Sequence, residues 1–550
     1  MHILYVGMSK TMRAPPGLRD NPPTPTPMPC DRPRPDPLRR RALLAPVLAA
    51  VLASGALAQS GGIQLPDLGP PADGERRGLR EPASSGGVDR IELPEIGASA
   101  RGSLSAEREK AIGEAFLRVL RQEVPLVDDP EVEVYIQGLG QRLVAHSDAT
   151  TERFGFFVVQ DPRINAFAAP GGHIGVHTGL ILAAESESEL AAVLAHEIGH
   201  VTQGHIARRF EMADRMTIPT LAALAASILL ATQSSQAGAA AIAATQAGAV
   251  QAQINFTRGN ELEADRVGVQ TLADAGFDPR SMPTFFERLQ RSLQYARRPP
   301  EYLSTHPVTD SRIADTRGRA ERYPYRQRPD SLAYQLMRAK LRVLTAPDPV
   351  QVQRDFERQL AEGTPADNRA ARYGKALALA RAGRLEPALV ELRALSSADP
   401  DNAALRAERA RLELATGNGA KALAVLAEGL ATYPTDRILT LGQAEAMLKL
   451  GRAGEARDSL LAYGRGWQPG PNYYRLLARS QELAGNLLEA HLAMAEYQYL
   501  MGETKLAVEQ LERARKAAAD DFYAASRIDA RLAPLKEQLA EEKARRRRGP

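Results

Sequence analysis

Residues 190–200 of the chain read LAAVLAHEIGH, and the fold of the surrounding residues can be inferred from this motif. Its apolar periodicity predicts a helix over 188–210. On a helix, His196 and His200 are four residues apart and lie on one face, so two imidazoles can bind one zinc ion. Glu197 lies one step around the helix, where it can remove a proton from water. The motif therefore predicts a hydrolytic metal centre.

A zinc site of this kind needs a third protein ligand. The metzincin spacing would place Gly and His at positions 203 and 206, where this chain has Gln and Ile, and His205 is out of register. The other common source is a glutamate on a downstream helix, and residues 260–265 read NELEAD. Glu261 and Asp265 share a helix face. Glu261 can therefore complete a site for one Zn²⁺ per chain, while Asp265 hydrogen-bonds the outer nitrogen of a ligand histidine.

Each motif alone is ambiguous. An isolated HExxH also occurs on surface helices, where two histidines flank a solvated glutamate. A short acidic turn of a helix is likewise usually a solvated face. The two motifs together favour the metal site over these alternatives.

The combination of HEIGH with NELEAD resembles the HtpX-type zinc metallopeptidase family. The resemblance implies an α+β domain of the zincin type, with a small sheet and the HExxH helix. It implies that the zinc ligands are His196, His200 and Glu261. It also implies that Glu197 is the general base and that Asp265 is the hydrogen-bond partner of His196.

Further segments are similar to an exported subgroup of this family that carries tetratricopeptide repeats, the BepA-type proteases. They are LPEIG at 93–97, INAF at 164–167, and STHP at 304–307 with Arg312 downstream. The resemblance implies a periplasmic protein that supports outer-membrane protein assembly and degrades stalled clients. Its partners would be unfolded or stalled outer-membrane proteins and their assembly machinery. His306 could then occupy the fourth zinc position and hold the protease in check; the alternative is a histidine in an ordinary proline-containing turn.

Two strands are predicted before the motif helix. The β-branched and aromatic run from Phe154 to Val159 predicts one, and the glycine-flanked segment from His173 to His177 predicts another. Proteases commonly bind an extended substrate by adding it to a sheet edge. We expect the second segment to be that edge, formed by Asn165, His173, Ile174, Gly175, Val176 and His177. Its two histidines are expected to be packing or surface residues, because zinc already has three ligands.

The positive charge of the chain is concentrated at its beginning. The net charge is +4 over 550 residues, whereas residues 1–58 alone carry +5, so the remainder gives no support for nucleic-acid binding. Three arginines at 39–41 precede an apolar run that ends in a small-x-small sequence at Ala58. This pattern predicts a cleaved signal peptide over 1–58 and a periplasmic protein, with Met28 as an alternative start after a proline-rich extension. An uncleaved membrane anchor is the alternative, although the run is short for a span.

The remaining boundaries follow from composition and periodicity. Residues 59–104 are rich in Gly, Pro and Ser and predict a flexible linker. Helical periodicity begins near Ser105, so the metallopeptidase domain is expected over 105–325, with a connecting helical segment over 326–360. An Ala-rich insertion at 218–252 lies between the two metal motifs. It predicts a lid or a helical hairpin and is the candidate for peripheral contact with a membrane.

The carboxyl half carries a repeat of 34 residues. Its marker glycines are Gly383, Gly417, Gly451 and Gly485. This period predicts tetratricopeptide helix pairs over 361–544, with glycine in the turn, followed by a basic tail at 545–550. Gly502 falls half a period after Gly485, which predicts that the last repeat unit is out of phase with the others. The solenoid would offer a concave surface to a polypeptide partner; spacer and dimer-contact roles are the alternatives.

The predicted fold is therefore mainly α, with a zincin-type α+β domain followed by an α-solenoid. Three functions remain open. The chain could be a zinc endopeptidase with a recognition solenoid, a chaperone or assembly scaffold whose protease is largely silent, or a repeat-based binding protein with a structural zinc. A structural site would not need Glu197 beside the metal, which favours an enzyme.

Overall fold

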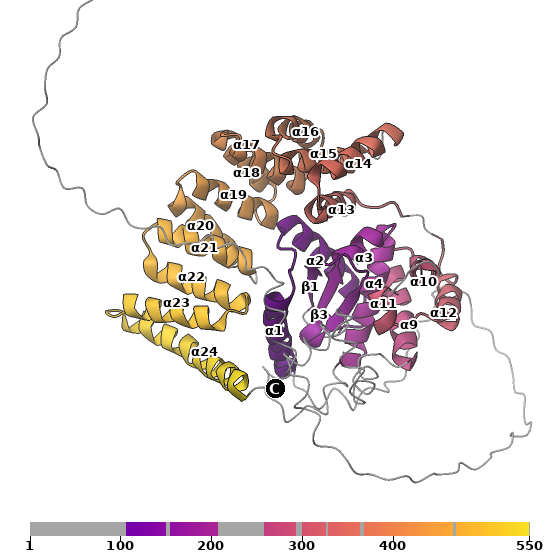
Figure 1. Ribbon diagram of the computed structural model, residues 1–550, viewed down its shortest axis with the longest axis horizontal. Coiled ribbons are helices and arrows are strands. Elements are labelled where there is room, and N and C mark those ends of the chain that lie inside the picture. The colour runs from indigo at the N-terminus through magenta and orange to yellow at the C-terminus, as the bar shows by residue number, and fades with distance from the viewer. Residues whose placement is uncertain are drawn as a thin grey trace, which may run out of the picture.

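The computed structural model describes residues 106–149, 154–206, 258–292, 300–325, 328–363, 368–465 and 469–548. Within them, a small α+β part is followed by a long series of helices (Figure 1), which confirms the prediction of a mainly α chain. The predicted signal peptide, the linker and the insertion at 218–252 lie outside the described residues. In the described ranges, no helix has both the length and the apolar character needed to cross a membrane.

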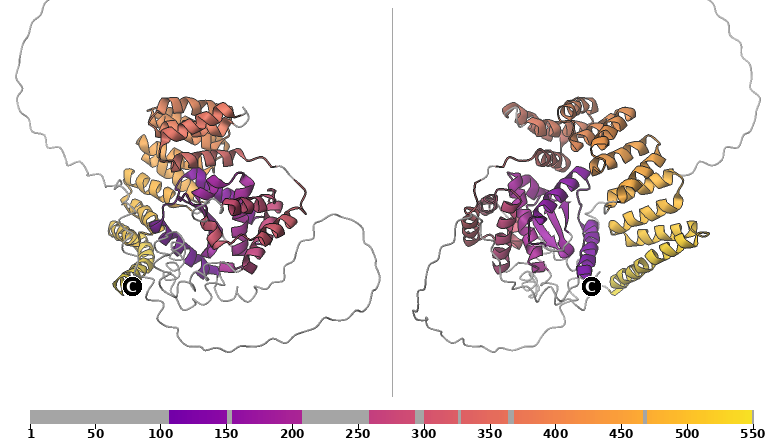
Figure 2. Two further views of the ribbon diagram at one scale, coloured as in Figure 1. Left: turned by 45° about the vertical axis from the view of Figure 1, so that its right-hand side comes forward. Right: turned by 180° about the vertical axis from the view of Figure 1, so that it is seen from behind.

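The α+β part contains a small sheet surrounded by helices (Figure 2). In chain order its elements are α1 (Ala106–Glu123), α2 (Pro130–Val144), β1 (Gly155–Val159), β2 (Ala166–Ala169), η3 (Pro170–Gly172), β3 (His173–His177), α3 (Thr178–Ala183), α4 (Glu187–Thr202), α9 (Arg258–Asp274), α10 (Ser281–Ser292), α11 (Glu301–Thr305) and α12 (Asp310–Ala320). Both predicted strands are present, as β1 and β3.

The sheet has the strand order β1, β3, β2, with β1 parallel and β2 antiparallel to β3. His173 pairs with Gly155 on one side and with Ala169 on the other. The prediction that His173–His177 is a substrate-binding edge is therefore wrong. The backbone groups of a central strand are already used by its two neighbours, and only an edge strand has groups left to pair.

Helix α4 lies at the centre of the α+β part, and all of its residues are buried. Ser186 caps its first turn by accepting a hydrogen bond from the Glu189 amide. The helix ends at Thr202, earlier than predicted, and Gly204 follows with a φ of 66°. This left-handed conformation, which glycine adopts without strain, turns the chain away from the helix axis.

Small residues bring α4 and α9 close together. A Cβ atom on Gly199 of α4 would lie 3.0 Å from the carbonyl oxygen of Ala264, and one on Gly268 of α9 would lie 3.2 Å from the His196 amide nitrogen. Larger side chains at these positions would push the helices apart. The close approach carries Glu261, on the first turn of α9, to the histidines of α4.

The second part is a helical solenoid. Its helices are α13 (Leu332–Thr345), α14 (Pro349–Glu362), α15 (Asn368–Arg381), α16 (Leu385–Ala398), α17 (Ala403–Ala415), α18 (Gly419–Thr432), α19 (Arg437–Lys449), α20 (Ala453–Gly464), α21 (Pro471–Leu483), α22 (Leu487–Leu500), α23 (Thr504–Ala517) and α24 (Phe522–Arg548). The four marker glycines lie in the turns within helix pairs, with φ between 76° and 85°. Gly502 forms the same kind of turn between α22 and α23, with a φ of 82°. The predicted basic tail differs, because α24 continues to Arg548.

Helix α13 is shared by the two parts. Tyr334 and Leu341 belong to the apolar core around α4, whereas Leu336 and Val343 belong to the core of the first repeats. The segment predicted as a connection at 326–360 therefore contains a helix that contributes to both cores.

The solenoid curves around the α+β part, and its inner side faces α1 and α2 (Figures 1 and 2). Arg121 of α1 donates a hydrogen bond of 2.9 Å to the Leu500 carbonyl oxygen. Arg437 of α19 forms an ion pair with Glu133 of α2. The chain itself therefore occupies part of the concave surface that the repeat predicted for a partner.

Candidate metal centre

Four buried side chains converge beside α4. They are His196, His200, Glu261 and His306, whose ligand atoms all lie within 4.8 Å of one another. The Nε2 atoms of His196 and His200 are 3.0 Å apart, and they lie 3.5 Å and 3.4 Å from the carboxylate oxygens of Glu261. His306 Nδ1 lies 3.4 Å from His196 Nε2 and 3.1 Å from Glu261 Oε1. The surface-helix alternative is wrong, because none of the four residues is more than 2% exposed.

These separations fit a tetrahedral metal ion. With bonds of about 2.0–2.1 Å, donor atoms at the corners of a tetrahedron lie about 3.4 Å apart. The contacts above span 3.0–3.5 Å. Imidazole nitrogens and a carboxylate oxygen are donors that divalent transition metals bind well. The residues present therefore fit a divalent metal site.

Glu197 lies beside this cluster. Both of its carboxylate oxygens are buried. Its Oε1 lies 3.5 Å from Nε2 of His306. Burial raises the pKa of this carboxyl group, although His306 and His196 oppose the shift. The position of this buried carboxylate beside the donor set suits a group that accepts a proton.

The segment that carries His306 is held by the INAF segment. The Tyr302 amide donates to the Ile164 carbonyl oxygen at 3.1 Å, and the Asn165 side chain donates to the Glu301 carboxylate at 3.2 Å. The rings of Tyr302 and His306 stack with their centroids 4.8 Å apart. The Asn165 side chain therefore supports the segment of His306.

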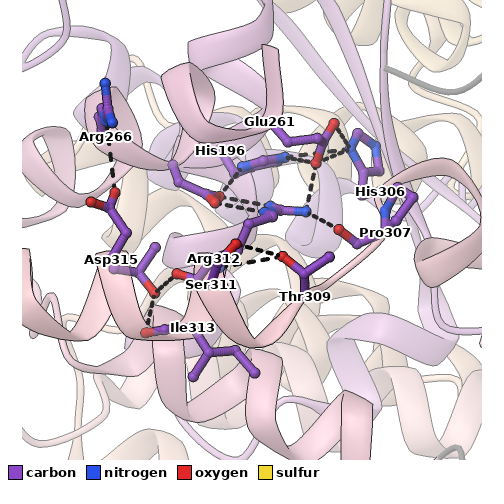
Figure 3. Close-up of polar contacts among 12 residues, drawn as sticks. His196, Glu261, Arg266, His306, Pro307, Thr309, Ser311, Arg312, Ile313 and Asp315 are labelled. Carbon is purple, nitrogen blue, oxygen red and sulfur yellow. Dashed lines mark hydrogen bonds and ion pairs between the residues drawn. The ribbon is translucent and has the colours of Figure 1, made fainter. Parts of the chain in front are cut away.

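Arg312 lies beside Glu261 and His196 (Figure 3), and Asp265 contacts both Arg312 and His196. His196 Nδ1 lies 2.9 Å from Asp265 Oδ1, a separation within the range of the predicted hydrogen bond. The Arg312 guanidinium donates two hydrogen bonds of 2.7 Å to Asp265, pairs with Glu261 at 2.7 Å, and donates to the Pro307 carbonyl oxygen at 2.8 Å. Burial opposes ionisation of Asp265, but Arg312 outweighs this effect and keeps its pKa below the usual value.

No role for Arg312 was predicted from the sequence. Its one signal was the spacing from the HP dipeptide, and that spacing does not show which carboxylates the side chain reaches.

His173 and His177 were expected to be packing or surface residues. His177 is fully buried against the Phe167 ring, and burial lowers its pKa to about 4. Neither His173 nor His177 joins a possible metal-binding group in the described part of the chain.

Comparisons with known proteins match both parts of the chain. Residues 130–320 match peptidase family M48, and residues 379–442 match a tetratricopeptide repeat. A putative beta-barrel assembly-enhancing protease of Vibrio cholerae is 39% identical over 451 residues, which cover 81% of this chain and 93% of that protein. The chain belongs to peptidase family M48.

This M48 peptidase is also 37% identical over 447 residues to the beta-barrel assembly-enhancing protease of Escherichia coli K12, covering 81% of the chain and 91% of that protein. It is 36% identical over 160 residues to the mitochondrial metalloendopeptidase OMA1 of Arabidopsis thaliana, covering 27% of the chain and 28% of that protein. The predicted enzyme class, a metalloendopeptidase, is therefore confirmed. The alternative of a binding protein with a purely structural zinc is wrong.

Proposed function

We propose that this M48 peptidase is a zinc-dependent endopeptidase of the periplasm that acts in the assembly of outer-membrane β-barrel proteins and cleaves unfolded or stalled clients. The observation that carries the proposal is the buried set of His196, His200 and Glu261 with the buried carboxylate of Glu197 beside it. The names of the relatives supply the link to β-barrel assembly.

In this proposal, His196, His200 and Glu261 hold one zinc ion. When bound, zinc acidifies water and polarises a carbonyl group. The carboxylate of Glu197 takes a proton from the attacking water and returns it to the leaving amine. Asp265 accepts the proton of His196 Nδ1 in a hydrogen bond, which keeps Nε2 of that ring free to bind metal.

His306 is proposed to regulate the same site. Its Nδ1 faces the ligand atoms and its Nε2 faces Glu197, so one ring takes both the fourth ligand position and the space beside the base. A peptide carbonyl needs that space. The arrangement supports a protease that is latent until the segment of His306 moves away.

A substrate edge remains available on the sheet, but on a different strand. Among the described residues, β2 pairs with β3 on one side only, and α4 packs against β2. We propose that an extended client pairs with β2, because main-chain hydrogen bonds bind peptides with little sequence preference. This replaces the edge predicted at 173–177.

The repeats are proposed to bring clients or assembly machinery to the peptidase, since solenoids commonly bind polypeptides. Periplasmic location rests on the signal predicted over 1–58 and on the relatives. The chaperone or scaffold alternative gains support from His306, because a filled fourth position keeps proteolysis low.

Complementation of a deletion strain separates these functions. Glu197→Gln keeps the shape and the ligands but removes the base. If proteolysis is the function, this variant restores neither outer-membrane integrity nor the removal of stalled clients. Restoration of both by Glu197→Gln at wild-type protein levels would reject the protease proposal and support the scaffold.

A further inference from the structure

His205 lies directly beside the proposed ligand His200. The left-handed turn at Gly204 brings the chain back after α4, and His205 is only 1% exposed. The two imidazole rings have centroids 5.0 Å apart. Nδ1 of His205 lies 2.8 Å from Nδ1 of His200, and its Nε2 lies 3.0 Å from a carboxylate oxygen of Glu263.

The ligand role of His200 determines the direction of these hydrogen bonds. Nε2 of His200 faces the cluster, 3.4 Å from Glu261, so this nitrogen offers its lone pair and the ring proton is on Nδ1. A hydrogen bond between two ring nitrogens needs one donor and one acceptor, so Nδ1 of His205 accepts. The proton of His205 is then on Nε2, where Glu263 accepts it. In the hydrogen-bonded series from His200 through His205 to Glu263, every donor therefore has an acceptor.

We propose that His205 is a positioning residue for the metal site and that Glu263 fixes its orientation. This inference rests on the proposed metal-binding role of His200. His205 and Glu263 would do for His200 what Asp265 does for His196, which is to fix the tautomer and the ring orientation. A mispositioned ring binds metal more weakly.

With this role for Glu263, each acidic residue of the NELEAD segment has a contact at or beside the proposed metal site. Glu261 faces the metal position, Asp265 contacts His196, and Glu263 contacts His205. All three belong to α9, which lies against α4. The second helix therefore supplies a ligand and orients both histidines of the first.

Zinc affinity of the full mature chain tests the inference, measured by competition with a chromophoric chelator alongside the melting temperature of the metal-free protein. His205→Leu removes the acceptor, and we expect zinc to bind about 10- to 100-fold more weakly. His205→Asn places an amide oxygen near the position of Nδ1, so we expect a smaller loss. His146→Leu, at an exposed histidine in the turn that follows α2, is the matched control and should bind zinc like the wild type.

A purely structural role predicts a different pattern. His205→Leu would then lower the melting temperature of the metal-free protein and leave zinc affinity unchanged, which would overturn the inference. If His205→Leu does not fold, Glu263→Ala decides, because the Glu263 side chain is one-third exposed and contributes little to packing. Weaker zinc binding by Glu263→Ala supports the inference, and unchanged binding overturns it. If the wild type binds no zinc, the proposed function itself fails.

Discussion

Arg312 neutralises two buried carboxylates: Asp265, which is proposed to orient His196, and Glu261, which is proposed as a zinc ligand. Its planar guanidinium donates to both carboxylates at once, and the single ammonium group of a lysine cannot reproduce this arrangement of donors. We therefore expect Arg312→Lys and Arg312→Met each to weaken zinc binding about 10- to 100-fold in a chelator competition.

Arg319 provides a control on the same helix. It pairs with Asp315 one turn away, and such a partly exposed pair contributes about 1 kcal/mol or less. Arg319→Met should bind zinc like the wild type. Wild-type zinc affinity in Arg312→Lys would show that charge alone, without bidentate geometry, is sufficient at this position.

The contact between α4 and α9 determines whether the ligands meet. Gly199→Ala places a methyl group 3.0 Å from the carbonyl oxygen of Ala264, which is backbone and cannot move independently of α9. We expect this variant to lose about 1–3 kcal/mol of unfolding free energy in urea denaturation, together with zinc affinity.

Gly138, on the exposed face of α2, is the matched control because a Cβ atom there meets nothing within 4 Å. Gly138→Ala should gain about 0.5–1 kcal/mol, since alanine has the higher helix propensity. If Gly199→Ala is as stable as Gly138→Ala, then α4 and α9 tolerate separation and their close packing is not required for stability.

Elements with local signals could be predicted from the sequence. The HExxH helix, the strands β1 and β3, and the glycine turns of the repeats all depend on short-range periodicity or spacing. The strand order could not be predicted, because the central position of β3 depends on pairing between segments that local patterns do not relate. The contacts of Arg312 and His205 could not be predicted for the same reason, because each joins residues of different elements.

The two parts of the molecule meet at a buried cluster of charges around Lys340 of α13. Its Nζ lies 2.9 Å from Asp129 and 3.0 Å from Glu131 of the α+β part, and 2.9 Å from Glu408 of α17. Tyr373 donates a hydrogen bond of 2.6 Å to Glu131. One amine therefore joins carboxylates from both parts, and its loss would leave buried charges uncompensated.

We expect Lys340→Met to lower the unfolding free energy by about 3–5 kcal/mol, measured in urea. Lys449→Met is the control: Lys449 forms an exposed one-turn pair with Glu445, worth about 0.5 kcal/mol or less. Adding Glu131→Gln to Lys340→Met should recover part of the loss. Equal effects of Lys340→Met and Lys449→Met would mean that the cluster does not stabilise the junction.

At the scale of the whole molecule, we propose that His196, His200 and Glu261 form a hydrolytic zinc centre that His306 keeps latent. The most direct measurement is zinc content together with the rate of cleavage of an unfolded protein, in the wild type, Glu197→Gln and His306→Ala. We expect one zinc and slow cleavage for the wild type, zinc without cleavage for Glu197→Gln, and faster cleavage for His306→Ala. A wild type without zinc, or cleavage by Glu197→Gln at the wild-type rate, would contradict the hydrolytic centre. Unchanged cleavage by zinc-loaded His306→Ala would contradict latency.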